Sequence, residues 1–438
     1  MRPASAYRDG LFPDQPSPVF PVHNERSQAP CTLKTARIMT KIVFVTAALP
    51  FGKGEEFFIC EFQELRSRVD VLIYPRRPGH RVIHREAALL VGLTIAPSGF
   101  RAMWAFLECF YQRFGKLASL AVQLACHSGS VTNCIKNFWV LPRGVYLYTL
   151  LRGERDIHIH GCWASTAATI AYVAADLLGT PWSFSCHRGD IKQNNMLAVK
   201  AASAAFVRCI SEDGRRWVSR LVGAGVASRL HVIHMGVRVP TRESIGDDQR
   251  RDLVLATPAS LLPVKGHRYL IEAVAQLMEL DLPRFKVLLF GDGPLRSDLA
   301  AAIGEHRLER VVQIVGHVDH QELIGLYEGG QIDIVVLPSI TTTDGEHEGI
   351  PVALLEAMAH GIPVVSTRSG SIAELVDENS GVLVPEKNVG QLRDALVPLL
   401  LDRQRRCALG HGGRLRVERE FNVLQVASAF VALANNAT

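Results

Sequence analysis

The chain has 438 residues, of which 21% are charged and 48% hydrophobic, a composition typical of a globular protein with two or three domains. No run of 18 or more apolar residues occurs, which excludes a predicted membrane-spanning helix, and the N-terminus lacks the sustained apolar core of a signal peptide. Nine scattered cysteines without a CxxC pair indicate reduced thiols. We therefore expect a cytoplasmic protein.

Charge is distributed unevenly along the chain. Residues 41–240 contain 24 Lys and Arg against 13 Asp and Glu, whereas residues 241–438 contain 19 against 27. This asymmetry predicts that the two halves meet different partners. No RNA- or DNA-binding motif accompanies the basic half, so we do not expect nucleic acid to be one of them.

The first 38 residues are rich in Pro, Ser, Arg and Gln without periodicity, which predicts a disordered lead-in. Beyond it we expect a strand at 41–47, a loop at 49–55, a helix at 56–68 and a strand at 69–74. A loop that follows the first parallel strand lies at the carboxyl edge of the sheet, where ligands bind. Gly52 and Gly54 in this loop are candidate contacts for an acceptor or a sugar.

A basic loop at 75–85 precedes a predicted helical region at 86–151. Two interpretations are open: core packing beside a solvated loop, or a surface that sits on an anionic membrane. We predict core packing for most of the aromatic residues and a lipid-facing role for the arginines of the loop. The aromatic residues in question are Trp104, Phe106, Phe110, Tyr111, Phe114, Phe138, Trp139, Tyr146 and Tyr148.

Strands are expected next at 156–160 and 182–185, on either side of a helix at 164–178. Each places a histidine, His160 or His187, at the carboxyl end of a strand, where it could accept a proton or bind a sugar hydroxyl. A satisfied structural histidine is the alternative for either one. Asp190 lies in the same segment as His187 and is a further candidate sugar contact, while His158 is expected to face the opposite side of the sheet.

Strands at 204–210 and 230–234 lead to an aperiodic linker at 235–248. The second half alternates strands with helices, such as the one at 266–280 with its single apolar stripe. This pattern predicts an α/β architecture of two doubly wound domains, 39–240 and 241–420, with a cleft between them. A C-terminal helix, 421–438, could cross back to the first domain. The expected strands of the second domain are 253–257, 286–290, 311–315, 332–337, 363–366 and 382–384.

The stretch 344–361 contains two carboxylates eight positions apart, Glu348 and Glu356. Pro351 and Gly361 delimit a short apolar helix. Free amides at its start predict an anion site, and a carboxylate within the helix suits ribose hydroxyls. The alternative is an amphipathic helix with two solvated glutamates.

Two further segments follow strands of the second domain. Lys265, at the start of a helix, could neutralise a diphosphate. Gly291, in a tight turn, could let a base or ribose approach. The alternatives are a surface lysine and a plain β–α turn. No metal site is predicted, because the Asp344-Gly-Glu346 segment has no strand leading directly into it.

In their order along the chain, these motifs resemble glycosyltransferase family 4, retaining transferases with the two-domain GT-B fold. The resemblance covers Lys41 to the C-terminus. It rests on the Glu348–Glu356 spacing and on the segments 262–266, 291–294, 232–237 and 369–374. Segments 55–61 and 183–191 and the one around His160 are similar to those of transferases that build exopolysaccharide and colanic-acid-type units on a polyprenyl diphosphate carrier.

The resemblance implies a UDP- or GDP-linked sugar donor, a glycan acceptor and no metal or other cofactor. Glu348 and His187 would act at the transferred sugar, and Glu356 would bind the ribose. The leaving diphosphate itself would help to deprotonate the acceptor hydroxyl. The residues expected to bind the donor are Lys265, Gly291, Gly349, Ile350, Pro351 and Glu356.

One position departs from the family. Where its members usually have an arginine five residues before the lysine, this chain has Ser260. Losing one charge-assisted contact to a diphosphate costs about 1.5–3 kcal/mol, which Arg188 or Arg268 could offset. Because of this missing charge, a non-catalytic binder of nucleotide sugars stays open as an alternative. A nucleotide-sugar epimerase of the same architecture is a second alternative.

Overall fold

The computed structural model describes residues 41–52, 54–79, 82, 85–241 and 252–437. The chain divides into a unit of residues 1–38 and a unit of residues 39–438. The predicted lead-in and the second half of the predicted linker lie outside the described residues, as does part of the basic loop 75–85.

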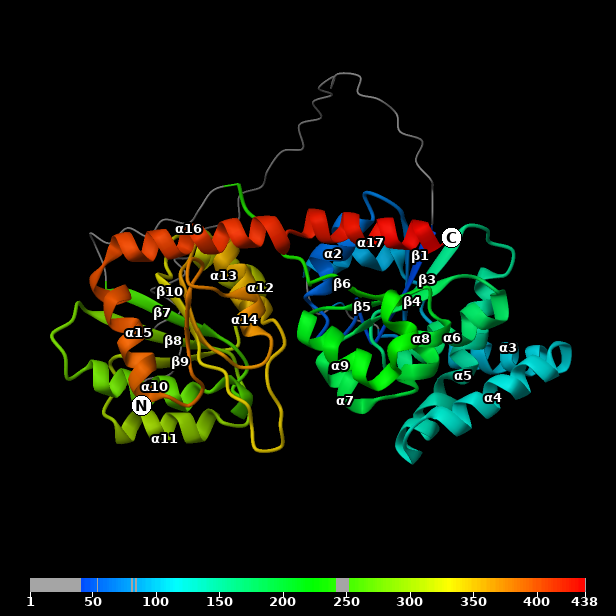
Figure 1. The fold of residues 1–438 in the computed structure, drawn as a ribbon, viewed down its shortest axis with the longest axis horizontal. Coiled ribbons are helices and arrows are strands. Elements are labelled where there is room, and N and C mark those ends of the chain that lie inside the picture. The colour runs from blue at the N-terminus through cyan, green and yellow to red at the C-terminus, as the bar shows by residue number, and fades with distance from the viewer. Residues whose placement is uncertain (1–40, 53, 80–81, 83–84, 242–251, 438) are drawn as a thin grey trace, which may run out of the picture. The chain divides into compact units, whose positions relative to one another are not determined.

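The first half forms a six-stranded sheet in the order β2-β1-β3-β4-β5-β6, with every neighbouring pair parallel (Figure 1). Apolar side chains fill both faces of its central strands, as expected when helices cover both sides of a parallel sheet. The strands are β1 (Lys41–Thr46), β2 (Asp70–Pro75), β3 (Ile157–Gly161), β4 (Trp182–Cys186), β5 (Phe206–Cys209) and β6 (Leu230–Val232).

The connections of this sheet are helical, and the predicted region 86–151 consists of four separate helices. These are η1 (Arg85–Leu93), α3 (Gly99–Gln112), α4 (Phe114–His127) and α5 (Val131–Leu151). The other connecting helices are α2 (Phe58–Leu65), α6 (Thr166–Leu178), α7 (Arg188–Gln193), α8 (Leu197–Ser203), α9 (Glu212–Val222) and η2 (Ala224–Arg229).

The second half forms another six-stranded parallel sheet, in the order β12-β11-β10-β7-β8-β9. The two doubly wound domains expected from the sequence are confirmed. The strands are β7 (Leu253–Pro258), β8 (Phe285–Phe290), β9 (Val312–Gly316), β10 (Ile334–Leu337), β11 (Val364–Thr367) and β12 (Val382–Val384). The helices are η3 (Pro263–Lys265), α10 (His267–Leu277), α11 (Arg296–Glu305), α12 (His320–Glu328), α13 (Val352–Ala359), α14 (Ile372–Leu375), α15 (Val389–Leu401), α16 (Arg403–Glu420) and α17 (Val423–Ala437).

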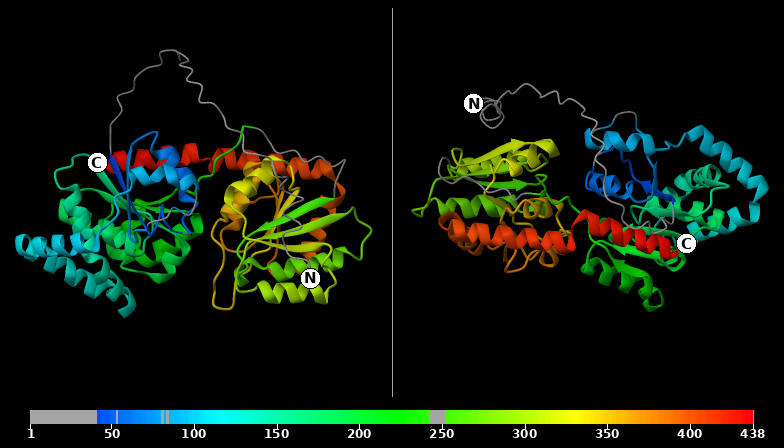
Figure 2. Two further views of the ribbon diagram at one scale, coloured as in Figure 1. Left: turned by 180° about the vertical axis from the view of Figure 1, so that it is seen from behind. Right: turned by 90° about the horizontal axis from the view of Figure 1, so that it is seen from above.

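The C-terminal helix α17 packs on the first sheet, beside α2 (Figures 1 and 2). The ring of Phe430 lies 5.6 Å from that of Phe44 on β1 and 5.7 Å from that of Phe206 on β5. Phe430 is fully buried. The last helix of the chain therefore completes the core of the first lobe.

The prediction of core packing for most of the aromatic residues in 86–151 is wrong. Tyr146 and Tyr148 are buried, but six of the nine are exposed: Trp104, Phe110, Tyr111, Phe114, Phe138 and Trp139. For the three that lie on α3, Trp104, Phe110 and Tyr111, the reason is the pattern of residue size on that helix. Its buried positions are Ala102, Ala105 and Cys109, and these small residues let the helix lie close to α5 while its large side chains point outward.

Within the described part of the chain, no helix combines the length and the apolar composition needed to cross a bilayer.

Candidate functional site

The second sheet places Lys265 and Glu348 at its switch point. Strands β7 and β10 are neighbours, and from them the connections run in opposite directions, a position where α/β sheets bind ligands at the carboxyl ends of the strands. The loop after β7 ends in η3 with Lys265, and the long loop after β10 carries Glu348. Lys265 Nζ lies 2.5 Å from Glu348 Oε1. Two residues that the sequence assigned to the donor thus form an ion pair.

Two glycines allow these loops to approach one another. At Gly291, directly after β8, a Cβ atom would lie 2.1 Å from the carbonyl oxygen of Ala259. At Gly370, where φ is +52°, a Cβ atom would lie 1.9 Å from the carbonyl oxygen of Glu348. Any larger residue at Gly370 would therefore push the Glu348 loop out of place.

The predicted anion-binding helix start is α13, with Pro351 at its N-cap. Gly349 and Ile350 lie in the turn that precedes it. Glu356 is on the helix, and its carboxylate oxygen Oε1 lies 2.7 Å from Nε2 of His320. The helix geometry is therefore as the sequence predicts, but the ribose-binding candidate already has a partner.

That partner, His320, was missed by the sequence analysis. It is the first residue of α12, and its Nδ1 lies 3.7 Å from the carboxylate of Glu86 in the first lobe. The hydrogen bond to Glu356 and the ion pair with Glu86 raise the pKa of His320 to about 10, so the imidazole is positively charged at neutral pH. One signal could have found it, because the loop after β9 meets the same sheet edge as the loops after β7 and β10.

In the first lobe, Glu55 closes the loop that follows β1. Its buried carboxylate accepts hydrogen bonds from the amides of Ala47, Ala48 and Leu49 at 2.6–2.9 Å. The indole N–H of Trp163, after β3, donates to the same carboxylate at 2.5 Å. One buried acid thus joins the loops at the β1–β3 switch point of this sheet.

The two glycines of this loop were predicted to contact an acceptor or a sugar. Their amides are used within the loop itself: Gly52 N–H donates to Ala48 O at 3.1 Å, and Gly54 N–H donates to the Glu56 carboxylate at 2.8 Å. Contact between either glycine and a ligand stays a prediction, and it would have to use the exposed edge of the loop rather than these donors.

His187, the candidate sugar contact, caps the start of α7 and is held by aromatic rings. Its imidazole centroid lies 4.4 Å from Trp163, 5.7 Å from Phe57 and 5.6 Å from Phe58. Nε2 is buried and makes no hydrogen bond within the described part of the chain. Burial lowers the pKa of His187 to about 3, so the ring is neutral. The Nε2 atom of a neutral, rigidly held imidazole can form one hydrogen bond with a hydroxyl group, as donor or as acceptor according to the tautomer.

The assignment of His160 as an acceptor or sugar contact is wrong for its side chain. The imidazole is buried 4.7 Å from Phe430 of α17 and bonds Ser183 and Ser185 at 2.7 and 2.9 Å. His158 was expected on the opposite face, but it bonds the same Ser183 hydroxyl at 2.7 Å. Residues two apart on a strand share a face, so both histidines belong to the core under α17.

Asp190 is also a supporting residue rather than a sugar contact. Its buried Oδ2 accepts the amides of Ala164 at 3.1 Å and His187 at 3.5 Å. Nearby, the fully buried Nζ of Lys200 donates to the carbonyls of Ala164 and Ser165 at 2.8 and 2.9 Å. Burial lowers the pKa of Lys200 to about 7 and raises that of Asp190 to about 6. Together these two residues fix the loops that carry Trp163 and His187.

Arg188 connects the first lobe to the loop of Glu348. Its guanidinium donates to the carbonyl of His347 and, at 2.6 Å, to that of Gly345. A pocket between the lobes is lined by residues of both, including Arg188, Trp217, His347 and Gly349. Arg268, the other candidate for replacing the missing arginine, is exposed and pairs with Glu272 on its own helix at 2.9 Å. Of the two, Arg188 is the one beside the site.

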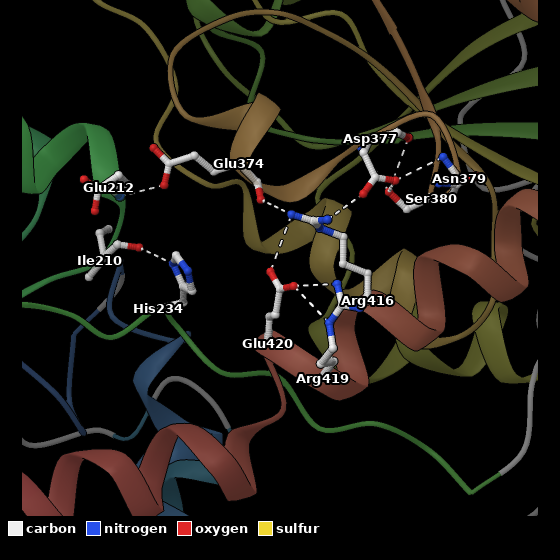
Figure 3. A network of polar contacts seen from close by, with 10 residues as sticks. All are labelled: Ile210, Glu212, His234, Glu374, Asp377, Asn379, Ser380, Arg416, Arg419 and Glu420. Atoms are coloured by element: carbon white, nitrogen blue, oxygen red, sulfur yellow. Dashed lines mark hydrogen bonds and ion pairs between the residues drawn. The ribbon is translucent and has the colours of Figure 1, made fainter.

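A second link between the lobes is centred on Glu374 (Figure 3). Its carboxylate accepts the amides of Glu212 and Asp213, at the start of α9, at 2.6 and 2.7 Å. Arg416 donates to the carbonyl of Glu374 at 2.8 Å and to the carboxylate of Asp377 at 2.5 Å. The anion that caps α9 of the first lobe is therefore supplied by the second lobe.

Comparison with known proteins identifies the second lobe. Residues 242–416 match the family model of glycosyl transferases group 1. The second lobe is a group 1 glycosyltransferase domain. Lys265, Glu348, Glu356 and Gly370 all belong to this domain.

Two similar proteins align with this chain over about half of their own length. The amylovoran biosynthesis glycosyltransferase AmsK of Erwinia amylovora is 34% identical over 212 residues, 48% of this chain and 51% of that protein. The putative colanic acid biosynthesis glycosyltransferase WcaL of Escherichia coli K12 is 37% identical over 215 residues, 47% of this chain and 51% of that protein. The chain thus spans about half the length of these relatives.

The similarity to solved structures extends across both lobes. The structure of Anabaena Alr3699/HepE in complex with UDP superposes with a TM-score of 0.65 over 91% of this chain and 100% of that one, at 16% identity. Such a likeness shows the GT-B arrangement of two doubly wound domains, of which the group 1 domain is the second.

Proposed function

We propose that the protein is a retaining glycosyltransferase of family 4. It would transfer a sugar from a UDP- or GDP-linked donor to a glycan acceptor on a lipid carrier, during synthesis of an exopolysaccharide or another cell-surface polysaccharide. The observation that carries the proposal is the Lys265–Glu348 pair at 2.5 Å, at the switch point of a group 1 domain. The exopolysaccharide role is supported by the names of the relatives AmsK and WcaL.

In the proposed reaction the donor diphosphate replaces Glu348 as the partner of Lys265. The amides around Gly349 and Ile350, before α13, bind the same diphosphate, and the ribose hydroxyls bind Glu356. Glu348, released from Lys265, faces the transferred sugar. Positive charge at the diphosphate comes from side chains and amides, so the proposal includes no divalent ion.

Transfer then proceeds on one face of the sugar. The bond from the anomeric carbon to the diphosphate oxygen breaks, and the acceptor oxygen bonds to the same face of that carbon. The acceptor proton moves to the departing diphosphate. Neutral His187 holds a sugar hydroxyl through Nε2 during this step. Catalysis rests on stabilising the charge of the leaving diphosphate, the type of contribution that usually dominates when charge develops.

The proposal places the enzyme on the cytoplasmic face of the membrane. A polyprenyl diphosphate carrier keeps the acceptor at the membrane, and the nucleotide-sugar donor is soluble. The first lobe would face the acceptor, consistent with its excess of Lys and Arg.

The test is nucleotide release. The wild-type protein is incubated with UDP- and GDP-sugars and a polyprenyl-diphosphate-linked glycan, with Glu348→Gln as the inactive variant and Glu346→Gln as a control two residues away. We expect release by the wild type and the control only, and only with acceptor present. Folded wild-type protein that binds donors but releases no nucleotide would contradict the proposal. An epimerised sugar formed from donor alone would point to an isomerase instead.

A further inference from the structure

The helical insertion of the first lobe exposes an unusual amount of apolar surface. Of the large hydrophobic side chains that are exposed in the described part of the chain, twelve fall within residues 100–139. All the exposed aromatic residues of the described chain are among them. Phe100 is 80% exposed, Tyr111 84% and Trp139 75%. Large exposed apolar areas are uncommon on soluble monomers, and where they occur they mark interaction surfaces.

The apolar side chains form stripes along two helices. On α3, Phe100, Trp104, Leu107 and Tyr111 recur at the spacing of one helical face, opposite the buried Ala102 side. At the start of α5 the exposed apolar positions are Val131, Ile135, Phe138 and Trp139. Figures 1 and 2 show that α3 and α4 extend outward from α5 at the end of the first lobe. We call these eight residues the apolar face.

Basic residues accompany the apolar face. Residues 99–139 contain four Lys and Arg residues and one acidic residue, Glu108. Two of the basic side chains are engaged by the protein: Lys116 lies 3.3 Å from the carboxylate of Asp176, and Arg113 donates to the carbonyl of Leu177 at 3.1 Å. Arg101 and Lys136 are exposed on α3 and α5, beside the apolar stripes. A helix with an apolar face, interfacial Trp and Tyr, and flanking cations is typical of a membrane-surface element.

We propose that the apolar face inserts into the interfacial layer of an anionic phospholipid bilayer, with Arg101 and Lys136 at the headgroups. Charge complementarity favours lipid over a second copy of the chain. In a two-fold symmetric dimer the same surface meets itself, so the cationic flanks would repel each other. Against anionic headgroups each cation is instead attracted, and the apolar side chains leave water.

This surface differs from the one that the sequence favoured. The arginines of the loop 75–85 were expected to face lipid while the aromatic residues filled a core. Here the aromatic residues themselves form the surface, on helices outside that loop. The inference deepens the proposed function, because a lipid-linked acceptor lies in the same bilayer. It is tested without donor or acceptor, however, so its failure can be distinguished from a failure of the proposed function.

The experiment is flotation of the full-length protein with vesicles of phosphatidylcholine alone or with phosphatidylglycerol added. We expect the wild type to bind the anionic vesicles and Trp104→Ser/Trp139→Ser to bind about tenfold or more weakly. Arg101→Gln/Lys136→Gln should lose about fivefold per charge, on anionic vesicles only. Met278→Ser/Leu280→Ser, which changes exposed apolar residues of the second lobe, is the matched control and should bind like the wild type.

Insertion is measured by quenching of tryptophan fluorescence with brominated lipid. Trp104→Phe/Trp139→Phe should still bind vesicles but lose most of the quenching. Circular dichroism spectra and thermal unfolding midpoints, equal in all variants, show that they are folded. The proposal would be overturned if the wild type bound neither kind of vesicle, or if the serine variants bound anionic vesicles as tightly as the wild type does. Self-association of the wild type that these variants abolish, without lipid binding, would assign the face to a second copy instead.

Discussion

The imidazole of His320 lies 2.7 Å from the carboxylate of Glu356 and 3.7 Å from that of Glu86. One protonated ring therefore joins the ribose-binding candidate on α13 to the first lobe. The ordinary pKa of a histidine is 6.5, and these two carboxylates raise that of His320 to about 10. The folded protein binds this proton more tightly than the unfolded chain does. The contacts of His320 with the two carboxylates, called the His320 pair below, therefore stabilise the folded state at every pH at which the ring is charged.

The His320 pair makes stability depend on pH in a defined window. Its contribution is complete below pH 6.5 and is lost as the pH rises through 10. We expect the difference in unfolding free energy between the wild type and His320→Gln to be largest near pH 6 and to vanish above pH 10. Urea unfolding at pH 6, 8 and 10 measures it. The exposed His306→Gln is the control, and a difference that is constant with pH would contradict the assignment.

Lys265 should matter far more than the neighbouring Arg268. Lys265→Met removes a charge-assisted contact to the donor diphosphate, worth about 1.5–3 kcal/mol, so donor-dependent turnover should fall by about one to two decades. Arg268→Met removes an exposed pair with Glu272 and should change turnover little. Steady-state nucleotide release measures both variants. Equal losses would show that Lys265 is not the specific diphosphate ligand.

Arg188 and Ser260 should compensate for one another. The Arg188 guanidinium already binds two carbonyls of the Glu348 loop, and we expect it to supply the positive charge that Ser260 lacks. Arg188→Gln should lower kcat about tenfold or more, and adding Ser260→Arg should restore part of the loss. If Ser260→Arg leaves the Arg188→Gln variant unchanged, then Arg188 acts by holding the loop rather than by its charge.

Lys200 should be essential for the stability of the first lobe. Lys200→Met leaves the carbonyls of Ala164 and Ser165 without their donor and Asp190 without a nearby cation, which should lower the unfolding free energy by about 3–5 kcal/mol. Lys192→Met, whose exposed side chain lies 3.9 Å from Asp344, should cost less than about 1 kcal/mol. Denaturant titrations compare the two. Similar small losses would mean that the buried amine is not needed.

The sequence predicts this fold well because parallel strands buried on both faces are short apolar runs, and because ligand sites occur where such strands end. Lys265 and Glu348 both follow strands of the second sheet, so their proximity could be expected from their places in the chain. The boundaries of the helix around Glu356 were predictable for a similar reason, since Pro351 and Gly361 mark its ends.

The predictions that were wrong, or that missed a residue, share one cause: packing between segments that are distant in the sequence. His160 stands at the end of a strand like His187, but α17 covers its face of the sheet, and nothing near position 160 indicates that. The outward direction of Trp104 depends on the small residues that α3 turns toward α5. Glu55 resembles a surface carboxylate until the loop after β1 folds around it. Each outcome is decided by a partner that local pattern does not specify.

The packing of Phe430 against Phe44 has a consequence for the order in which the protein is made. The strand that carries Phe44 leaves the ribosome among the first described residues, and the helix that covers it leaves among the last. During synthesis the surface formed by Phe44, Phe206 and His160 therefore stays uncovered while the entire second lobe is translated. A premature stop after α16 would release a chain whose first lobe lacks its cover, so we expect such a product to be retained by chaperones and degraded even though every residue at the donor site is present.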